Sequence, residues 1–190
     1  MVNRIRKLER ELRRLQKLVF YDELTGVLNR RGFKEEAEKA FRVVYPSARY
    51  QNRRTPMPVR FCILFTDIDN FKKINDTFGH EVGDKALKRI GAALRKTLRS
   101  EDLFGRWGGE EFVVALLWAR AAQARMVAER IRRNIEQINL KVKNRRVPVT
   151  ASIGIALHSR EKDIFELIQT ADKAMYRAKK LGKNRVFEFG

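Results

Sequence analysis

A continuous apolar run constrains the fold of this chain more than any other feature. Residues 61–65 read Phe-Cys-Ile-Leu-Phe, and the run ends abruptly in Thr-Asp-Ile-Asp at residues 66–69. Such a run is typical of a central strand that is covered on both faces. Ligands bind at the ends of such strands in α/β sheets, so Asp67 and Asp69 suggest a divalent metal that holds a phosphorylated substrate. The alternative is that one of them only caps the next helix.

A second acidic cluster lies in the pentapeptide Gly108-Gly109-Glu110-Glu111-Phe112. It separates two segments rich in β-branched, aromatic and aliphatic residues, 103–107 and 112–117, and therefore predicts a hairpin. A Gly-Gly step can take the positive φ angles of a tight two-residue turn, and it leaves room for a ligand near the backbone. Alone, the pentapeptide would be read as a solvated turn, but together with the first cluster it indicates an active site.

Helices and strands alternate along the rest of the chain. A helix from about Arg30 leads through an Arg-rich loop at 49–60 to a first strand at 60–67. Apolar spacing predicts further helices over 87–98, 124–138 and 163–181, and strand-like segments at 140–143, 147–157 and 185–189. This order predicts an α/β domain, an α+β sandwich in which a mixed central sheet is flanked by helices.

The first twenty residues have an apolar pattern of their own. Steps of three and four residues separate Ile5, Leu8, Leu12, Leu15 and Val19. This spacing predicts the seam of a coiled coil, here called the seam, and it is too short to be stable by itself. We therefore expect residues 1–20 to be a coiled-coil signalling helix at the end of a linker, and residues 21–190 to be the main domain. The alternative is a single helix packed on its own domain.

Composition bounds the cellular context and the partners. One cysteine, Cys62, excludes an internal disulfide and indicates a reducing, cytoplasmic protein. The longest apolar stretch, 112–119, is too short to span a membrane, and no secretory signal opens the chain. The net charge of +19 attracts anions in general. Because no recognition helix or aromatic stacking platform accompanies it, a solvated basic face is favoured over dedicated nucleic-acid binding.

The motifs follow one another in the order of a known family. Residues 67–84 contain Asp-Ile-Asp-Asn-Phe-Lys-Lys-Ile-Asn-Asp, followed by Thr-Phe-Gly-His-Glu-Val-Gly-Asp. Asp22-Glu23-Leu24-Thr25-Gly26 precedes them, and Gly108–Phe112, Ser152–Ala156, Ala171–Tyr176 and Gly182–Arg185 follow. With these pieces the chain closely resembles the GGDEF family of diguanylate cyclases, which implies the palm-like fold of nucleotide cyclases and polymerases.

The resemblance implies a reaction and a metal site. Two GTP molecules would be joined into cyclic di-GMP with release of two pyrophosphates, in a homodimer whose half-sites face each other. Asp67 and Glu110 would provide side-chain oxygens, and Ile68 its main-chain carbonyl, to two Mg²⁺ ions in each active site, with Mn²⁺ as an alternative. Glu111 would lie beside the reaction centre, either as a base or as a residue that only shapes the site.

The same resemblance implies the substrate contacts. Asn75 and Asp84 would read guanine, because a carboxylate accepts hydrogen bonds from the base and an amide can both donate and accept. Taken alone, Asn75 could be a turn residue and Asp84 a helix cap. Phosphate would be held by main-chain N–H groups near Asn70, Phe71 and Lys72, and by the side chains of Lys179 and Lys183. Position 183 is often arginine in the family, so the lysine keeps the charge without the bidentate fork.

A regulatory site is implied by Arg99-Ser100-Glu101-Asp102. Arg99 and Asp102 match the family's inhibitory product-binding site, which predicts that cyclic di-GMP inhibits the enzyme. Taken alone, Arg-x-x-Asp would be a surface ion pair. The main alternative function is an inactive cyclic di-GMP receptor; a nucleic-acid-binding domain and a related purine specificity are further alternatives. An upstream sensor domain is expected. The full-length protein would then be either free in the cytoplasm or anchored in a membrane, with this chain on the cytoplasmic side.

Overall fold

The computed structural model describes residues 2–44, 60–143, 145–159 and 162–189. Helices and strands alternate along them, as the apolar spacing predicts. The helices are α1 (Val2–Phe20), α2 (Arg30–Val44), α4 (Phe71–Phe78), α5 (His80–Thr97), α6 (Ala121–Glu136) and α7 (Ile164–Lys180). The strands are β1 (Arg60–Ile68), β2 (Leu103–Arg106), β3 (Glu111–Ala119), β4 (Leu140–Val142), β5 (Arg145–Val147), β6 (Ala151–Leu157) and β7 (Val186–Glu188).

The main sheet has five strands in the order β2-β3-β1-β6-β7. β1 is antiparallel to both of its neighbours, β3 and β6, and β2 is antiparallel to β3. β7 runs parallel to β6, so the sheet is mixed, as predicted. β4 and β5 form a separate two-stranded sheet.

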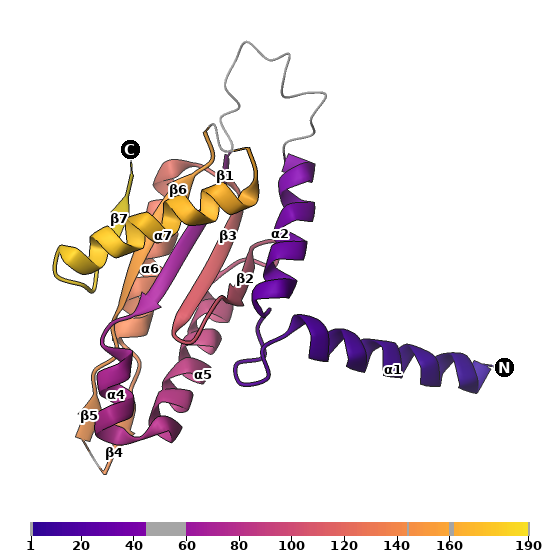
Figure 1. The fold of residues 1–190 in the computed structure, drawn as a ribbon, viewed down its shortest axis with the longest axis horizontal. Helices are drawn as coiled ribbons and strands as arrows, with labels where there is room; N and C mark the ends of the chain where they lie inside the picture. The colour runs from indigo at the N-terminus through magenta and orange to yellow at the C-terminus, as the bar shows by residue number, and fades with distance from the viewer. Residues whose placement is uncertain (1, 45–59, 144, 160–161, 190) are drawn as a thin grey trace.

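Helices cover both faces of this sheet. Successive side chains of a strand point to opposite faces. Phe61, Ile63 and Phe65 of β1 therefore pack with apolar residues of α2 and α7, whereas Cys62 and Leu64 pack with residues of α4, α5 and α6. Figure 1 shows α7 and α2 in front of the sheet and α6 behind it. The prediction that residues 61–65 form a central, fully buried strand is confirmed.

Two predicted elements differ from the structure. The segment 147–157 is not one strand, because β5 ends at Val147 and β6 begins at Ala151. Pro148 lies in the gap, and proline has no N–H group for a strand ladder. The predicted helix at 87–98 begins earlier, at His80. The predicted Arg-rich loop lies, up to residue 59, outside the described residues.

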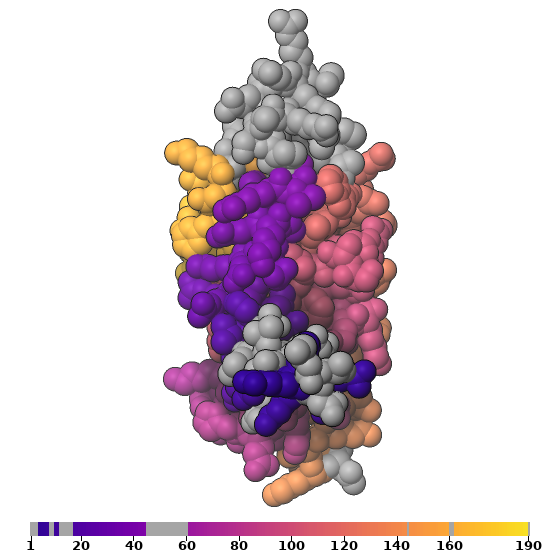
Figure 2. Space-filling model, turned by 90° about the vertical axis from the view of Figure 1, so that its right-hand side faces the viewer, coloured from indigo at the N-terminus to yellow at the C-terminus, as the bar shows by residue number. Residues whose placement is uncertain are grey.

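The N-terminal helix α1 extends away from the domain (Figure 1) and is seen nearly end-on in Figure 2, where α2 covers the face above it. Ile5 and Val19 of the seam are 52% and 39% exposed, which argues against a helix packed on its own domain. The side-chain amide of Asn29 donates to the carbonyl oxygens of Val19 (2.9 Å) and Tyr21 (3.4 Å) and ties the base of α1 to the domain. Neither α1 nor any other described helix is long and apolar enough to cross a membrane.

Candidate active site

The two acidic clusters meet where β1 ends beside the β2–β3 connection. Asp67 lies directly opposite Glu111 in the antiparallel ladder of β1 and β3. The N–H of Ile68 donates to the main-chain oxygen of Glu110 at 3.3 Å. Because residues that oppose each other across an antiparallel pair point to the same face, Asp67 and Glu111 share one side of the sheet. The structure thus brings together two acidic residues, Asp67 and Glu110, that are 43 positions apart in the sequence.

Lys179 provides a positive charge at this place. Its Nζ lies 2.7 Å from Oδ1 of Asp67, and the Asp67 residue is only 7% exposed. Burial raises the pKa of the Asp67 carboxyl, and the contact with Lys179 offsets only part of that effect. Glu110 and Asp69 add to the rise by like-charge repulsion. Lys179 is in the last turn of α7, so this helix provides the cation for the end of β1.

More carboxylates surround this ion pair than one lysine can neutralise. Burial raises the pKa of Glu111, and the nearby charges of Asp67, Asp172 and Glu110 raise it further. Burial also raises the pKa of Asp172, on α7, against the effect of Lys179. A cluster with excess negative charge that resists ionisation is typical of a site completed by bound cations.

The residues at this place fit a divalent metal that arrives with a substrate. Within the described ranges, no three His, Cys, Asp or Glu side chains are close enough to form a metal site by themselves. Mg²⁺, however, usually binds through one or two protein carboxylates together with substrate phosphates and water. The carboxylates of Asp67 and Glu110, with the Ile68 carbonyl, are a donor set of that kind.

The connection between β2 and β3 is longer than predicted. It spans residues 107–110, and the described glycines with positive φ are Gly26, Gly79 and Gly182, so the tight Gly-Gly turn with positive φ is wrong. Four residues can reverse the chain without a left-handed residue. A Cβ on Gly108 would lie 2.5 Å from Oε2 of Glu111, so a side chain there would shift the Glu111 carboxylate. No atom lies within 4 Å of a Cβ built on Gly109, so the surface there is open to a ligand.

Arg106, which the sequence did not single out, holds this connection in place. Its Nε donates to the carbonyl oxygens of Gly108 (3.2 Å) and Gly109 (3.1 Å), and its Nη2 donates to Gly109 O at 2.7 Å. The guanidinium also forms an ion pair with Asp22, with 3.1 Å between Nη1 and Oδ2. Burial alone would raise the pKa of Asp22, but hydrogen bonds from Thr25 and the charge of Arg106 outweigh it and lower that pKa.

Asn75 and Asp84 lie on two successive helices. Asn75 is inside α4 and Asp84 is inside α5, whose N-cap is Gly79, so neither the turn nor the cap interpretation holds. Asp84 is exposed and Asn75 is partly exposed. Oδ1 of Asn75 is nevertheless buried, with no hydrogen-bond partner among the described residues. Buried acceptors without a partner are rare in folded proteins.

The predicted phosphate contacts gather at the start of α4. The first N–H groups of a helix have no partner within the helix and point outward, which suits the main chain of Phe71 and Lys72 for binding an anion. Asn70 precedes them with a left-handed backbone (φ 56°). Lys183 donates from Nζ to Oδ1 of Asn70 at 2.5 Å, so the Lys183 side chain lies beside the start of this helix.

Asp69 does not cap α4, because the N-cap of that helix is Asn70. Its carboxylate accepts hydrogen bonds from Ser152 Oγ (2.7 Å), Thr150 Oγ1 (2.8 Å) and the main-chain N–H of Asn184 (2.9 Å). Asn184 is the last of three successive residues with positive φ, 182–184. Asp69 therefore fixes the turn that carries Lys183, a role for which the sequence gives no signal, because its partners are more than 80 residues away.

Arg99 and Asp102 form a tight turn at the start of β2, the end opposite the Gly108-Gly109 connection. The Asp102 carboxylate accepts from the main-chain N–H of Arg99 at 3.1 Å, and burial raises the pKa of Asp102. The Arg99 side chain is 63% exposed, and its ion pair is with Glu101 at 4.0 Å, not with Asp102. The turn therefore presents the Arg99 guanidinium to solvent.

Comparison with known proteins identifies the family of this chain. Residues 19–185 match the family model described as "Diguanylate cyclase, GGDEF domain". The chain is similar to diguanylate cyclase DosC of Escherichia coli (strain K12), with 38% identity over 191 residues. That match covers 98% of this chain and 38% of DosC, so the chain spans well under half the length of this relative.

Solved structures give the same result. Diguanylate cyclase SiaD from Pseudomonas aeruginosa, in complex with its activator SiaC, has a TM-score of 0.82 at 31% identity over 99% of this chain and 69% of that one. The GGDEF domain of DgcB from Caulobacter crescentus, in complex with c-di-GMP, has a TM-score of 0.79 at 27% identity over 89% and 95% of the two chains. The chain belongs to the GGDEF family of diguanylate cyclase domains.

Proposed function

We propose that this chain is the catalytic part of a diguanylate cyclase, which condenses two GTP into cyclic di-GMP and two pyrophosphates. The observation that supports this most is the pairing of Asp67 with Glu111, which gathers Asp67, Glu110 and Lys179 at one end of β1. Each GTP 3′-hydroxyl attacks the α-phosphorus of the other nucleotide. Each attack forms one P–O bond, breaks the bond to pyrophosphate and releases the hydroxyl proton.

Positioning and charge neutralisation dominate such a reaction. Asn75 and Asp84 hold the guanine base between α4 and α5. The first N–H groups of α4, with Lys179 and Lys183, hold the phosphates. When bound, Mg²⁺ neutralises the triphosphate and lowers the pKa of the attacking hydroxyl. Asp67, Glu110 and the Ile68 carbonyl are the residues that would hold it.

Glu111 acts on the reaction centre from the edge of this site. Its carboxyl is half-buried beside Asp67, and its raised pKa makes it a candidate to accept the hydroxyl proton. Gly108 leaves the space in which that carboxylate lies. In the proposed mechanism Glu111 thus acts beside the reaction centre without being a metal ligand.

A homodimer is required, because one site holds one GTP and the product contains two. The seam of α1 is proposed to bring two domains together, and a sensor domain upstream would act through it. SiaD is solved with an activator protein, which supports control of such a domain by a partner. We place the reaction in the cytoplasm, where GTP is available. This holds whether the full-length protein is free in the cytoplasm or anchored in a membrane.

Cyclic di-GMP is proposed as an inhibitor at Arg99 and Asp102. The exposed Arg99 fork can meet guanine acceptors or phosphate. The DgcB domain solved with c-di-GMP supports binding of this product by the family. A receptor without turnover would need only this second site; the retained carboxylates at 67, 110 and 111 favour the enzyme.

Incubation of the purified chain with GTP and Mg²⁺, with products resolved by chromatography and mass, tests the proposal. Cyclic di-GMP should form with the parent chain and not with Glu110→Ala. Absence of product, with binding of added cyclic di-GMP that is lost in Arg99→Ala, would instead identify a receptor.

A further inference from the structure

Gly83 lies directly against the side chain of Asn75. It is a buried residue of α5, facing α4. A Cβ atom built on Gly83 would lie 1.9 Å from Asn75 Oδ1, 3.0 Å from Asn75 Cγ and 3.1 Å from Phe71 Cζ. A contact of 1.9 Å does not occur between real atoms, so any side chain at position 83 would displace the Asn75 carboxamide.

The backbone gives no other reason for a glycine here. The described glycines with positive φ do not include Gly83, so its conformation is open to every residue type. Glycine inside a helix is also less favourable than alanine, because it loses more conformational freedom on folding. Local structure therefore favours alanine at position 83, and the contacts with α4, of which the one with Asn75 is by far the shortest, explain glycine.

The atom that occupies this space has no hydrogen-bond partner. Oδ1 of Asn75 is buried and unpaired among the residues of known placement. In contrast, the Asp84 carboxylate, next along α5, is exposed. The carboxamide is planar, so the position of Oδ1 against Gly83 also fixes the direction of the amide nitrogen.

We propose that Gly83 is a positioning residue that determines base specificity. By leaving space for the Asn75 carboxamide, it sets the orientation in which that amide meets the guanine edge. The inference rests on the proposed function, since it concerns the base of GTP. A site that holds its hydrogen-bonding groups rigidly rejects a base that lacks one of the matching groups, and a rotated amide loses that discrimination.

A pair of glycines on the same helix makes the test sharp. Gly83 and Gly91 are both buried in α5, but the nearest atom to a Cβ built on Gly91 is 3.5 Å away, an ordinary contact. Gly83→Ala and Gly91→Ala therefore share the change in helix propensity and differ in their effect on Asn75. The readouts are kcat/KM for GTP and for ATP, in which an amino group replaces the guanine O6 acceptor that an amide nitrogen can bind, and calorimetric binding of 3′-deoxy-GTP, which cannot react.

We expect Gly83→Ala to lower kcat/KM for GTP and the affinity for 3′-deoxy-GTP by about tenfold or more. The preference for GTP over ATP should fall with them, to the level of Asn75→Ala. Gly91→Ala should match the parent chain. Gly83→Ala that also matches the parent would overturn the proposal.

A double-mutant cycle separates an effect through Asn75 from a general one. In an Asn75→Ala background, Gly83→Ala should cause no further loss, since the displaced group is gone. An equal loss in both backgrounds would mean that position 83 acts through Phe71 or the helix packing, which contradicts the inference. If the parent chain made no cyclic dinucleotide, the proposed function would fail, while binding of 3′-deoxy-GTP to these variants would still decide the role of Gly83.

Discussion

Glu111 has a carboxyl group whose surroundings oppose its ionisation. Burial raises its pKa, and the charges of Asp67 and Asp172 raise it further. Because the folded-state pKa is higher than the unfolded value, this charge costs stability above the folded pKa. The cost disappears as the pH falls below the ordinary value of 4.5. The same surroundings that suit a proton acceptor thus weaken the fold at neutral pH.

We therefore expect Glu111→Gln to raise Tm by a few degrees at neutral pH while lowering the cyclase rate by about tenfold or more. The gain in Tm should vanish below the ordinary pKa of 4.5 in calorimetry across a pH series. Glu129→Gln is a control of opposite sign, because Arg132 and Arg133 lower the pKa of Glu129. A lower Tm for Glu111→Gln at neutral pH would contradict this interpretation.

Arg99 is expected to control the response to product. Its side chain is exposed, and Asp102 holds the turn through the main chain of Arg99 and not through the guanidinium. Arg99→Ala should therefore keep the turn while raising the concentration of cyclic di-GMP that halves the rate, by about tenfold or more. Lys96→Ala removes an equal charge from the last turn of α5 and should leave inhibition in place. Unchanged inhibition in Arg99→Ala would rule out this site.

At the scale of elements, Arg106 links the base of α1 to the connection between β2 and β3, residues 107–110. It binds Asp22, in the turn that follows α1, and the carbonyl oxygens of Gly108 and Gly109. Its main-chain N–H also donates to Leu28 O at 2.7 Å, beside the turn that Asn29 ties to α1. We therefore expect a shift of α1 to act through these contacts on the connection that carries Glu110 and Glu111.

Loss of this guanidinium should affect both stability and rate. We expect Arg106→Ala to lower the free energy of unfolding by about 1–3 kcal/mol, because hydrogen-bonded partners are left unpaired, and to lower the cyclase rate. Arg106→Lys should restore part of each, since lysine keeps the charge without the fork.

The pH dependence identifies the partner of Arg106. The folded-state pKa of Asp22 is lowered, so its ion pair contributes stability above the ordinary value of 3.8 and loses it as the pH falls through the folded pKa. The difference in Tm between parent and Arg106→Ala should accordingly shrink as the pH falls below 3.8, the ordinary pKa of Asp22. A difference independent of pH would mean that Asp22 is not the partner that matters.

The sequence predicts elements better than it predicts such connections. β1 and α7 have apolar patterns that match their burial, so both were predicted nearly to their ends. Arg106 and Asp69 were missed as links because their partners, Asp22 and Asn184, are distant in the chain. Segment 147–157 was predicted as one strand because β-branched residues recur along it, although Pro148 interrupts the ladder.

The residues of the candidate site were predicted from the sequence, but the spaces that their side chains occupy were not. The resemblance to the GGDEF family led to Asp67, Glu110, Asn75 and Asp84, and the fold brings the first two together and puts the others on adjacent helices. It could not give the space at Gly83 or Gly108, because such contacts depend on the packing of one element against another.

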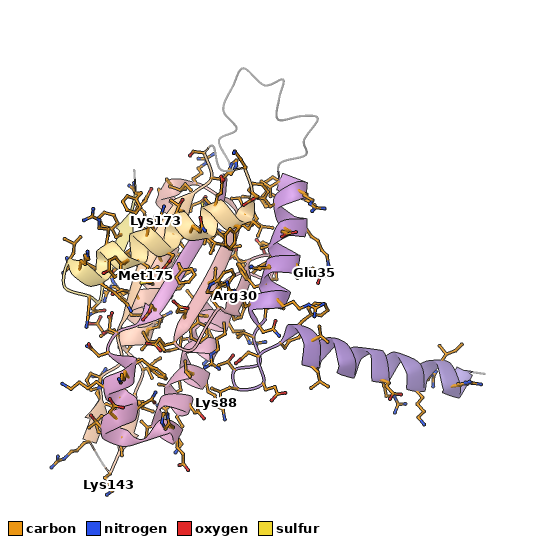
Figure 3. All side chains as sticks on the ribbon, in the orientation of Figure 1. Arg30, Glu35, Lys88, Lys143, Lys173 and Met175 are labelled. Carbon is orange, nitrogen blue, oxygen red and sulfur yellow. The ribbon has the colours of Figure 1, made fainter. Side chains whose placement is uncertain are left out.

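The positive charge is spread over the described surface, as with Lys88 on α5, Lys143 at the β4–β5 turn and Lys173 on α7 (Figure 3).

For the whole molecule, α1 is expected to set the local concentration of two domains. Ile5 and Val19 of the seam are exposed in the single chain, so a second copy can cover them. Deletion of residues 2–19 should lower the rate per chain by about tenfold in dilute solution and have little effect at high protein concentration. Ile5→Glu should act in the same direction. Arg10→Glu, on another side of the helix, is the matched control, and equal effects of the two would contradict pairing through the seam.

The rate of cyclic di-GMP formation against protein concentration, with GTP and Mg²⁺ in excess, tests the central claim most directly. That claim is that two chains each contribute half of one reaction centre, built on Asp67 and Glu110. The rate per chain should rise with protein concentration and then level off, and Glu110→Ala should make no product at any concentration. A rate per chain that stays constant while the protein is monomeric, or product from Glu110→Ala, would contradict it.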